Sequence, residues 1–294
     1  MNAGSTDVVA SSARRFNAPG PAVGVALGAG GARGLAHIVV LEALEELGVR
    51  AVAVSGSSMG AIVGAAWASG IRAADLRVHV LSIFGNKPLT IARLMRARVG
   101  KFTDFLTRFD SNPVLLDAEL LLQLFWPPGM PDRFEDLEIP LAVVATNYHR
   151  RRLAIFESGP LAPPVAGSMA IPGLVKPVEI DGLVLVDGGL IDPLPYRALK
   201  DRADVIVACD VMGASATHQH KPPKPYAALI GAAQIVQYTI TREMLKVDRP
   251  DILLRPPVGR FKALDFFLAA QILEAARGVK DDIKRGLDQR LGRL

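Results

Sequence analysis

Short runs of apolar residues recur along the chain, and several of them are rich in β-branched side chains. Such runs, bounded by turn residues, are typical of strands that are buried on both faces of a parallel sheet. They cover residues 22–27, 51–54, 141–146, 153–156, 183–186 and 204–209. With helical patterns between them, they predict an α/β fold that has three α/β/α layers and a mostly parallel central sheet.

The first two apolar runs flank a helical pattern that ends near Leu47 and is followed by Gly48. A glycine directly after the last turn is a common signal for the end of a helix. Strand, helix and strand in this order form a βαβ unit, whose right-handed crossover makes the two strands parallel neighbours. We therefore expect the loops after both strands to emerge at the same edge of the sheet.

Residues 71–128 show a helical pattern that is interrupted at glycine and proline residues. Within it, residues 87–109 interleave apolar side chains with Arg and Lys, against one acid, Asp104. Such a segment can lie on an anionic membrane surface, or it can be an ordinary helix with a solvated face over the core. We treat residues 87–130 as a candidate helical lid inserted into the domain.

Length and composition limit the class of protein. The chain has 294 residues, of which 50% are hydrophobic, and this predicts one domain with an insertion rather than two domains. Residues 1–20 are rich in Ser, Ala, Asn and Gly and lack the apolar stretch of a signal peptide, so we expect a disordered tail. The single cysteine, Cys209, excludes an intramolecular disulfide and fits a reducing compartment. We expect a cytoplasmic protein, with peripheral contact at the inner membrane as an alternative.

The charge of the chain adds little to this picture. A formal net charge of +5 and a pI near 9.5 favour anionic surfaces, but the excess is small and spread along the chain. We expect no nucleic-acid partner, and the oligomeric state is left open. Apart from His218 and His220, no cluster of Asp, Glu, His or Cys in the sequence has the spacing of metal ligands. We therefore expect neither a metal nor another cofactor.

The sequence Gly56-Ser57-Ser58-Met59-Gly60 joins an apolar strand run to an apolar helical run. A G-x-S-x-G turn in this position is a nucleophile elbow, in which glycines allow a sharp reversal and the serine is exposed at the helix N-terminus. The alternative is an ordinary tight turn, because small residues are common at such junctions. The two flanking runs favour Ser58 as a nucleophile, with Met59 beside it as a candidate substrate contact.

The first strand run continues into the glycine-rich loop 28–34, of sequence G-A-G-G-A-R-G. A dinucleotide site is one interpretation, but its fingerprint requires glycine where Arg33 stands, and no acidic residue ends the second strand. The other interpretation is an oxyanion hole, in which the N–H groups of Gly30 and Gly31 converge on an acyl oxygen beside Ser58. A simple tight turn would need fewer glycines. Arg33 is either a solvated residue or an anion contact.

Asp187 follows the apolar run 183–186 and precedes two glycines, Gly188 and Gly189. Another loop can approach a carboxylate closely at such a place. A carboxylate near a serine hydroxyl can serve as a general base if apolar surroundings raise its pKa. The alternative is a turn in which the carboxylate only caps the N–H groups that follow.

Together, the glycine loop, the G-x-S-x-G turn and the Asp187-Gly188-Gly189 sequence resemble the motifs of the patatin-like phospholipases, in particular the small bacterial members with one catalytic domain. The motifs occur in that family's order, and residues 167–173 also look like a family segment. The resemblance covers about residues 22–210. It implies a patatin-like fold and a catalytic domain over residues 21–294.

The resemblance further implies a serine acyl hydrolase that cleaves lipid ester bonds as a phospholipase, lysophospholipase or carboxylesterase. Ser58 would attack the acyl carbonyl, Asp187 would accept its proton directly, and the oxyanion would be stabilised by Gly30, Gly31 and Arg33. Two alternatives stay open. One is a conventional Ser-His-Asp esterase that uses His218 or His220, and the other is a non-catalytic, regulatory relative with the same fold.

Overall fold

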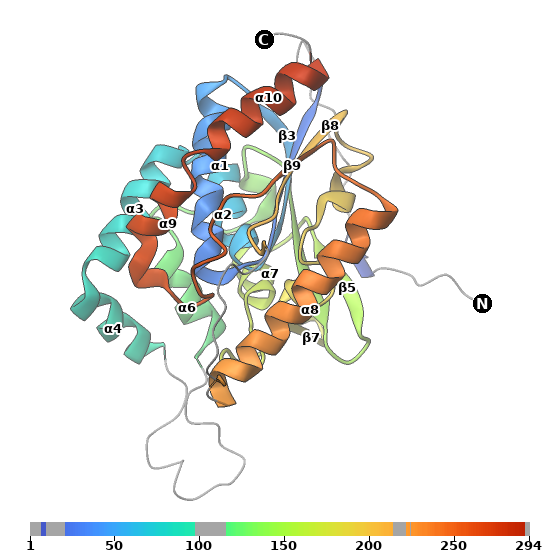
Figure 1. Ribbon diagram of the computed structural model, residues 1–294. Coiled ribbons are helices and arrows are strands. Elements are labelled where there is room, and N and C mark those ends of the chain that lie inside the picture. Colours follow the sequence, from blue (N-terminus) through green and yellow to red (C-terminus); the bar gives the residue numbers. More distant parts are fainter. Residues whose placement is uncertain (1–6, 10–20, 98–115, 214–221, 224, 292–294) are drawn as a thin grey trace, which may run out of the picture.

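The computed structural model describes residues 7–9, 21–97, 116–213, 222–223 and 225–291. Of the predicted disordered tail, residues 7–9 form a short strand, and the other residues lie outside the described ones. In the described part, the chain folds into one central sheet with helices on both of its faces (Figure 1).

The central sheet has nine strands in the described part of the chain. They are β1 (Asp7–Val9), β2 (Val23–Leu27), β3 (Ala51–Ser57), β4 (Leu141–Asn147), β5 (Arg152–Phe156), β6 (Val178–Ile180), β7 (Leu183–Val186), β8 (Val205–Cys209) and β9 (Ile252–Leu254). The main path runs in the order β1-β5-β4-β3-β2-β8-β9. Its neighbouring pairs are parallel except β4 and β5. The prediction of a mostly parallel sheet is confirmed, as is the parallel pairing of β2 with β3.

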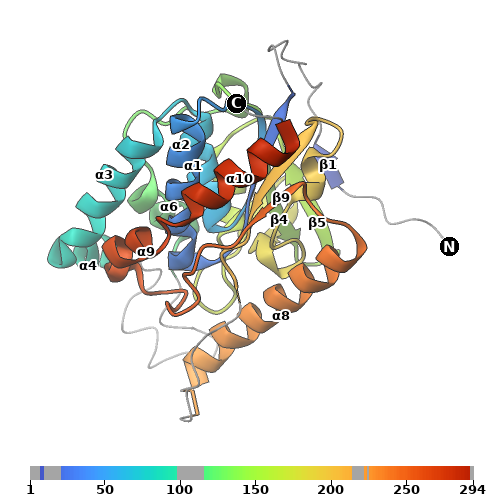
Figure 2. The ribbon, with the colours of Figure 1, turned by 45° about the horizontal axis from the view of Figure 1, so that its top comes forward.

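Helices cover both faces of this sheet. They are α1 (Ala36–Glu46), α2 (Met59–Ala68), α3 (Ala73–Gly85), α4 (Lys87–Arg96), α6 (Ala118–Phe125), α7 (Ala162–Ser168), α8 (Pro225–Val247), α9 (Ala269–Ala275) and α10 (Val279–Leu291). Figures 1 and 2 show α1, α2, α3, α9 and α10 on one side and α8 on the other, which confirms the three layers. None of the described helices combines the length and the apolar composition needed to cross a bilayer.

The strand side chains alternate between two apolar cores of unequal size, as expected for a sheet covered on both faces. Val25 of β2 belongs to the larger core, on the side of α1 and α2, whereas Ala26 belongs to the smaller one. The smaller core also contains Tyr196 and Leu245, and Leu245 belongs to α8. The Tyr196 hydroxyl donates to the Asp248 carbonyl at 2.8 Å. The smaller core therefore fixes the C-terminal half of α8 to the sheet.

The three motifs meet at one edge of the sheet, but not all of them reach it from the same direction. The parallel strands β2 and β3 end side by side, with Leu27 opposite Gly56. In contrast, β7 is antiparallel to β4, with Val186 opposite Thr146. The Thr146 hydroxyl donates to the Asp187 carbonyl at 2.8 Å. Asp187, which follows β7, therefore lies beside the carboxyl end of β4, although β7 runs in the opposite direction to β4.

Gly60, in the first turn of α2, lies where the turn after β3 crosses the glycine loop. A Cβ atom on Gly60 would overlap the Leu27 carbonyl oxygen, and neither backbone can move away inside the core. We expect Gly60→Ala to lower the free energy of unfolding by at least about 3 kcal/mol, because overpacking against backbone has no cheap relief. Urea denaturation followed by circular dichroism measures this.

Gly231 is the matched control, because it is also helical and a Cβ atom there meets no atom within 4 Å. Gly231→Ala should raise the free energy of unfolding by about 0.5–1 kcal/mol, the usual gain inside a helix. Equal stability of Gly60→Ala and wild type would contradict the close packing of the two loops.

Candidate active site

Ser58 occupies a strained turn between β3 and α2. Its backbone angles are φ 54° and ψ −122°, a region that residues other than glycine rarely adopt unless the surroundings hold them there. The Ser58 N–H donates to Ser168 Oγ at 2.8 Å, and the Ser168 hydroxyl donates to the Val144 carbonyl at 2.6 Å. Ser168 therefore ties this turn to both α7 and β4.

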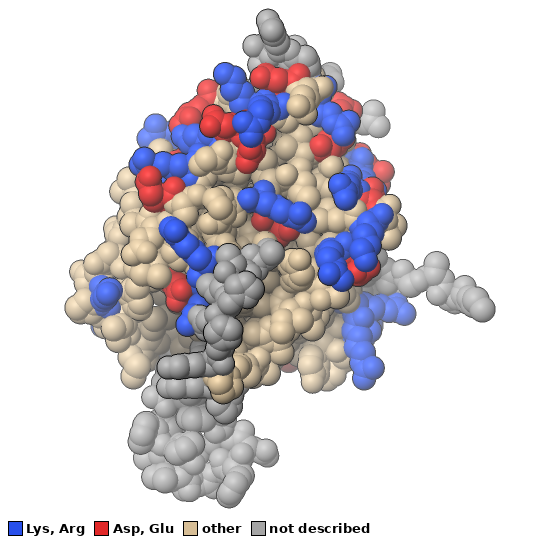
Figure 3. Space-filling view, in the orientation of Figure 1, with Lys and Arg blue, Asp and Glu red and all other residues tan. Residues whose placement is uncertain are grey.

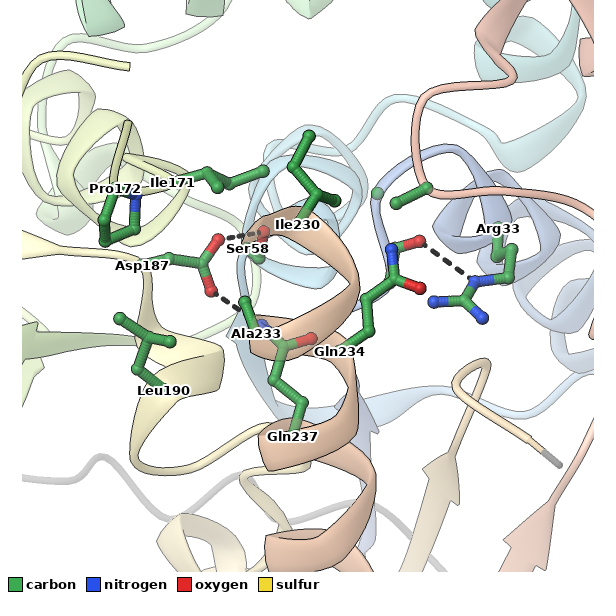
Figure 4. A pocket seen from close by; sticks show the side chains of 13 residues that line it. Arg33, Ser58, Ile171, Pro172, Asp187, Leu190, Ile230, Ala233, Gln234 and Gln237 are labelled. Atoms are coloured by element: carbon green, nitrogen blue, oxygen red, sulfur yellow. Dashed lines mark hydrogen bonds between the residues drawn. The ribbon is translucent and has the colours of Figure 1, made fainter. Parts of the chain in front are cut away.

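The structure brings Ser58 and Asp187 into direct contact (Figure 4). The Ser58 hydroxyl donates to Asp187 Oδ2 at 2.7 Å, and both side chains are buried. The other carboxylate oxygen, Oδ1, accepts the Gly189 N–H at 2.8 Å and a longer bond of 3.4 Å from Gln237 Nε2. The bond to Gly189 is the capping contact that the alternative interpretation of Asp187 required. One carboxylate therefore makes both contacts, through different oxygens.

Burial changes the proton affinity of Asp187. Loss of hydration disfavours the charged form and raises the pKa of Asp187 to about 6, although the hydrogen bonds from Ser58 and Gly189 act in the opposite direction. A carboxylate with a pKa near 6 is ionised at neutral pH and is a stronger base than an exposed one. It can accept a proton from a hydroxyl in contact with it.

The glycine loop is fixed at several points, and two of its N–H groups have no partner among the described residues. The N–H groups of Ala29 and Ala32 donate to the carbonyls of Pro193 and Ala263. The N–H groups of Gly30 and Gly31 donate to no acceptor in the described residues. Gly31 has φ 56°, which glycine adopts without strain. The loop can therefore present two backbone donors to an anion beside Ser58.

His37 supports this loop from the first helix. It is fully buried, and its Nε2 lies 2.8 Å from the Gly28 carbonyl. Burial lowers the pKa of His37 to about 4, against the opposing effect of that carbonyl, so the ring is neutral at neutral pH. Because a carbonyl only accepts, Nε2 must carry the proton. The ring thus anchors the loop and has no free charge for catalysis.

Arg33 is also buried, but its guanidinium contacts the protein backbone. Its Nε donates to the Gly30 carbonyl and its Nη1 to the Met212 carbonyl, both at 3.4 Å. Burial lowers the pKa of Arg33, and the charge of Asp210 opposes this change. In Figure 4, Arg33 lies across the pocket from Asp187. Among the described residues, the contacts of Arg33 therefore hold the glycine loop in position.

An apolar cavity of about 220 Å³ adjoins Ser58. Met59, the candidate substrate contact, lines it. The described part of the candidate lid contributes Leu94 from α4 and Leu121 from α6, while residues 98–115 of that segment lie outside the described residues. The cavity can hold an apolar chain with one end at the Ser58 hydroxyl.

Helix α8 closes the pocket over Ser58 and Asp187, which we call the Ser58 pocket, and this was not predicted from the sequence. Ile230, Ala233, Gln234 and Gln237 of α8 line it (Figure 4). The resemblance ended near residue 210, so it offered no motif for this helix. The sequence did contain one sign of a polar role for this helix. Gln234 and Gln237 are three residues apart, so they lie on one face of a helix that has no charged residue in that part.

Comparison with known proteins gives one family and several relatives. The model of the patatin-like phospholipase family matches residues 25–200. An uncharacterised NTE-family protein of Mycobacterium tuberculosis is 38% identical over 197 residues, which are 67% of this chain and 51% of that protein. The lysophospholipase nte1 of Emericella nidulans is 36% identical over 193 residues, which are 65% of this chain and 12% of that protein. The chain thus spans about half or less of these relatives.

Among solved structures, VipD from Legionella pneumophila aligns over 92% of this chain and 67% of its own, with 17% identity and a TM-score of 0.48. ExoU aligns over 91% of this chain and 53% of its own, with 18% identity and a TM-score of 0.38.

Ser168→Ala tests how the Ser58 turn is held. The substitution removes a buried hydroxyl and leaves the Ser58 N–H and the Val144 carbonyl without partners, so we expect a loss of about 1–3 kcal/mol in the free energy of unfolding. The exposed Ser82, whose hydroxyl bonds the His79 carbonyl within its own helix, is the control, and Ser82→Ala should change stability by less than about 0.5 kcal/mol. Similar small losses for both proteins would show that Ser168 does not hold the turn.

Proposed function

The chain belongs to the patatin-like phospholipase family, and we propose that it is a serine acyl hydrolase that cleaves ester bonds of phospholipids or lysophospholipids. One observation carries the proposal: the Ser58 hydroxyl donates directly to the buried Asp187 carboxylate at 2.7 Å. The pair has the contact that proton transfer needs, and it lies beside a cavity of the right chemistry for an acyl chain.

In the proposed reaction, Ser58 Oγ attacks the acyl carbonyl carbon and its proton passes to Asp187 Oδ2. The carbonyl oxygen becomes an oxyanion, and the N–H groups of Gly30 and Gly31 are the proposed donors to it. Collapse of the tetrahedral intermediate breaks the ester C–O bond, and Asp187 returns the proton to the leaving oxygen. Water then gives a proton to Asp187 and its oxygen attacks the acyl-serine carbonyl. The acyl–Oγ bond breaks, the fatty acid is released, and Asp187 returns the proton to Ser58 Oγ.

None of the histidines that the structure describes takes the place of a triad base. His37 contacts Gly28, His79 contacts the Phe125 carbonyl and His149 packs against Tyr148. None of these three contacts Ser58 or Asp187. His218 and His220, the candidates for a triad, lie outside the described residues.

The apolar cavity supports a lipid substrate, with Met59 in contact with the acyl chain. The relative from Emericella nidulans is named a lysophospholipase, which agrees with this class of substrate. We place the enzyme in the cytoplasm, with peripheral contact at a membrane surface where its substrate resides. Its single cysteine, Cys209, is a buried free thiol, as expected in a reducing compartment.

Ser58→Ala should abolish labelling by a fluorophosphonate probe, which reacts covalently with an activated serine. Asp187→Asn should lower kcat/KM on p-nitrophenyl butyrate by at least about a hundredfold, because the amide cannot accept the proton. Both variants should keep the wild-type melting profile, since the substitutions conserve the shape of the site.

The double variant His218→Ala/His220→Ala is the control, and it should keep most of the activity and all of the labelling. A hundredfold loss in this protein would favour the triad, and wild-type protein that the probe does not label would favour the non-catalytic relative.

The pH dependence of kcat/KM should follow the ionisation of Asp187. The base works as the carboxylate, so activity should be level above neutral pH and fall as the pH drops through about 6, the pKa of Asp187. Well below that pKa, the loss should be about tenfold per pH unit. An uncharged ester substrate keeps the substrate's own titration out of the profile.

Gln237→Met should move this acid limb to higher pH by about 0.5 of a pH unit, because it removes a donor that favours the carboxylate. Gln234→Met is the control, since Gln234 lines the same pocket without a bond to Asp187. Identical profiles for both variants would show that Gln237 does not act on Asp187.

A further inference from the structure

Helix α8 buries Ile230 and Leu245, but it also places polar side chains on its packed face and large apolar ones on its exposed face. The side that packs on the protein presents Gln234, Gln237 and Thr241, whereas Ile235 and Val236 point to solvent. A surface helix normally buries its apolar stripe and exposes its polar one. Ile235 is 68% exposed and Val236 is 46% exposed. The inward face is explained by the Ser58 pocket, but nothing in the described residues covers the outward face.

The outward side chains form one stripe. They are exposed and recur at spacings of one, three or four residues, at Ala228, Leu229, Ala232, Ile235, Val236 and Thr239. We call this stripe the uncharged face of α8. No charged residue occurs from residue 227 to residue 241, and charge returns only at Arg242, Glu243 and Lys246. Figure 3 shows the same division, with few charged side chains over the lower half of α8 and many over the upper part of the molecule.

Basic side chains are exposed at the same end of the molecule as this surface. The turn between β4 and β5 carries Arg150 and Arg151, and β5 begins with Arg152; all three are exposed, as is Tyr148 of the turn, at 57%. The turn lies at the same end of the molecule as the N-terminal half of α8, and blue side chains project there in Figure 3. Apolar and aromatic side chains beside arginines suit the interface of an anionic bilayer.

We propose that the uncharged face of α8 docks the enzyme on an anionic lipid bilayer. This rests on the proposed function, because a phospholipid substrate resides in such a surface. The helix would lie in the plane of the interface, since Arg242, Glu243 and Lys246 exclude its C-terminal half from the hydrocarbon. Its outward stripe would enter the headgroup region, while the opposite face stays on the Ser58 pocket.

The geometry links docking to substrate entry. Ile230, on the inward side of α8, lines the Ser58 pocket, and its neighbour Leu229, 54% exposed, belongs to the uncharged face. The edge of the docked helix is therefore also a wall of the pocket. The wall that α8 gives to this entry route carries no charged side chain from residue 227 to residue 241.

The test uses flotation of Ser58→Ala protein with vesicles of phosphatidylcholine, with or without phosphatidylglycerol, so that binding is measured without turnover. We expect binding to the anionic vesicles to be at least about tenfold tighter than to the neutral ones. Adding Ile235→Asp and Val236→Asp should weaken binding to anionic vesicles by at least about tenfold, because two charges replace apolar contacts.

The matched control adds the same two charges elsewhere, as Val78→Asp on α3 and Val247→Asp at the end of α8, where both side chains are exposed. It should bind within about twofold of the parent, since it changes net charge but not the uncharged face. Equal losses in the two double variants, equal binding to both kinds of vesicle, or no binding at all would overturn the proposal.

Two further measurements separate this proposal from others. If light scattering shows a dimer that Ile235→Asp/Val236→Asp dissociates, the uncharged face is a contact between two copies, and lipid docking is wrong. With Ser58 present, this double variant should hydrolyse soluble p-nitrophenyl butyrate at the wild-type rate. Failed docking with normal hydrolysis would refute only the docking surface, whereas no hydrolysis by wild type would refute the proposed function.

Discussion

The burial of one carboxylate is the constraint on which the rest of this site depends. Loss of water around Asp187 must be large enough to raise its pKa to about 6. The hydrogen bonds to its carboxylate must still be strong enough to keep it ionised at neutral pH. The backbone of Gly188 achieves part of this by packing against the Val144 carbonyl so closely that a side chain could not fit. Gln237 completes the enclosure from α8. The end of β7, the glycine turn after it and helix α8 thus enclose one carboxylate, the proposed proton acceptor.

Much of the fold could be predicted because it follows from local rules. Apolar runs gave the strands, and the Asp181-Gly182 pair joins β6 to β7 through a turn in which both residues have positive φ, 48° and 76°. The motifs after β2, β3 and β7 were likewise visible as turns at strand ends. Their meeting at one edge followed from parallel pairing for the first two, but the antiparallel approach of β7 to β4 had no local signal.

Other features of the site could not be predicted, because they depend on contacts between distant segments. Gln237 lies 50 residues from Asp187 in sequence. Only the packing of α8 against the face of the sheet that carries the smaller core brings the two side chains together. His37 is closer to its partner, Gly28, but its role depends on complete burial of the ring. Likewise, Arg33 faces the backbone of the glycine loop, an orientation that residue type alone does not determine.

The backbone of Ser58 has a consequence for how such a site persists. Its φ of 54° holds on the order of 1–3 kcal/mol of conformational strain, which glycine in the same place would relieve. Selection for a more stable fold alone would therefore favour glycine over serine here, and the proposed reaction would be lost with the hydroxyl. A sequence designed for this backbone with thermostability as the only criterion would be expected to place glycine at position 58 and so to remove the proposed nucleophile.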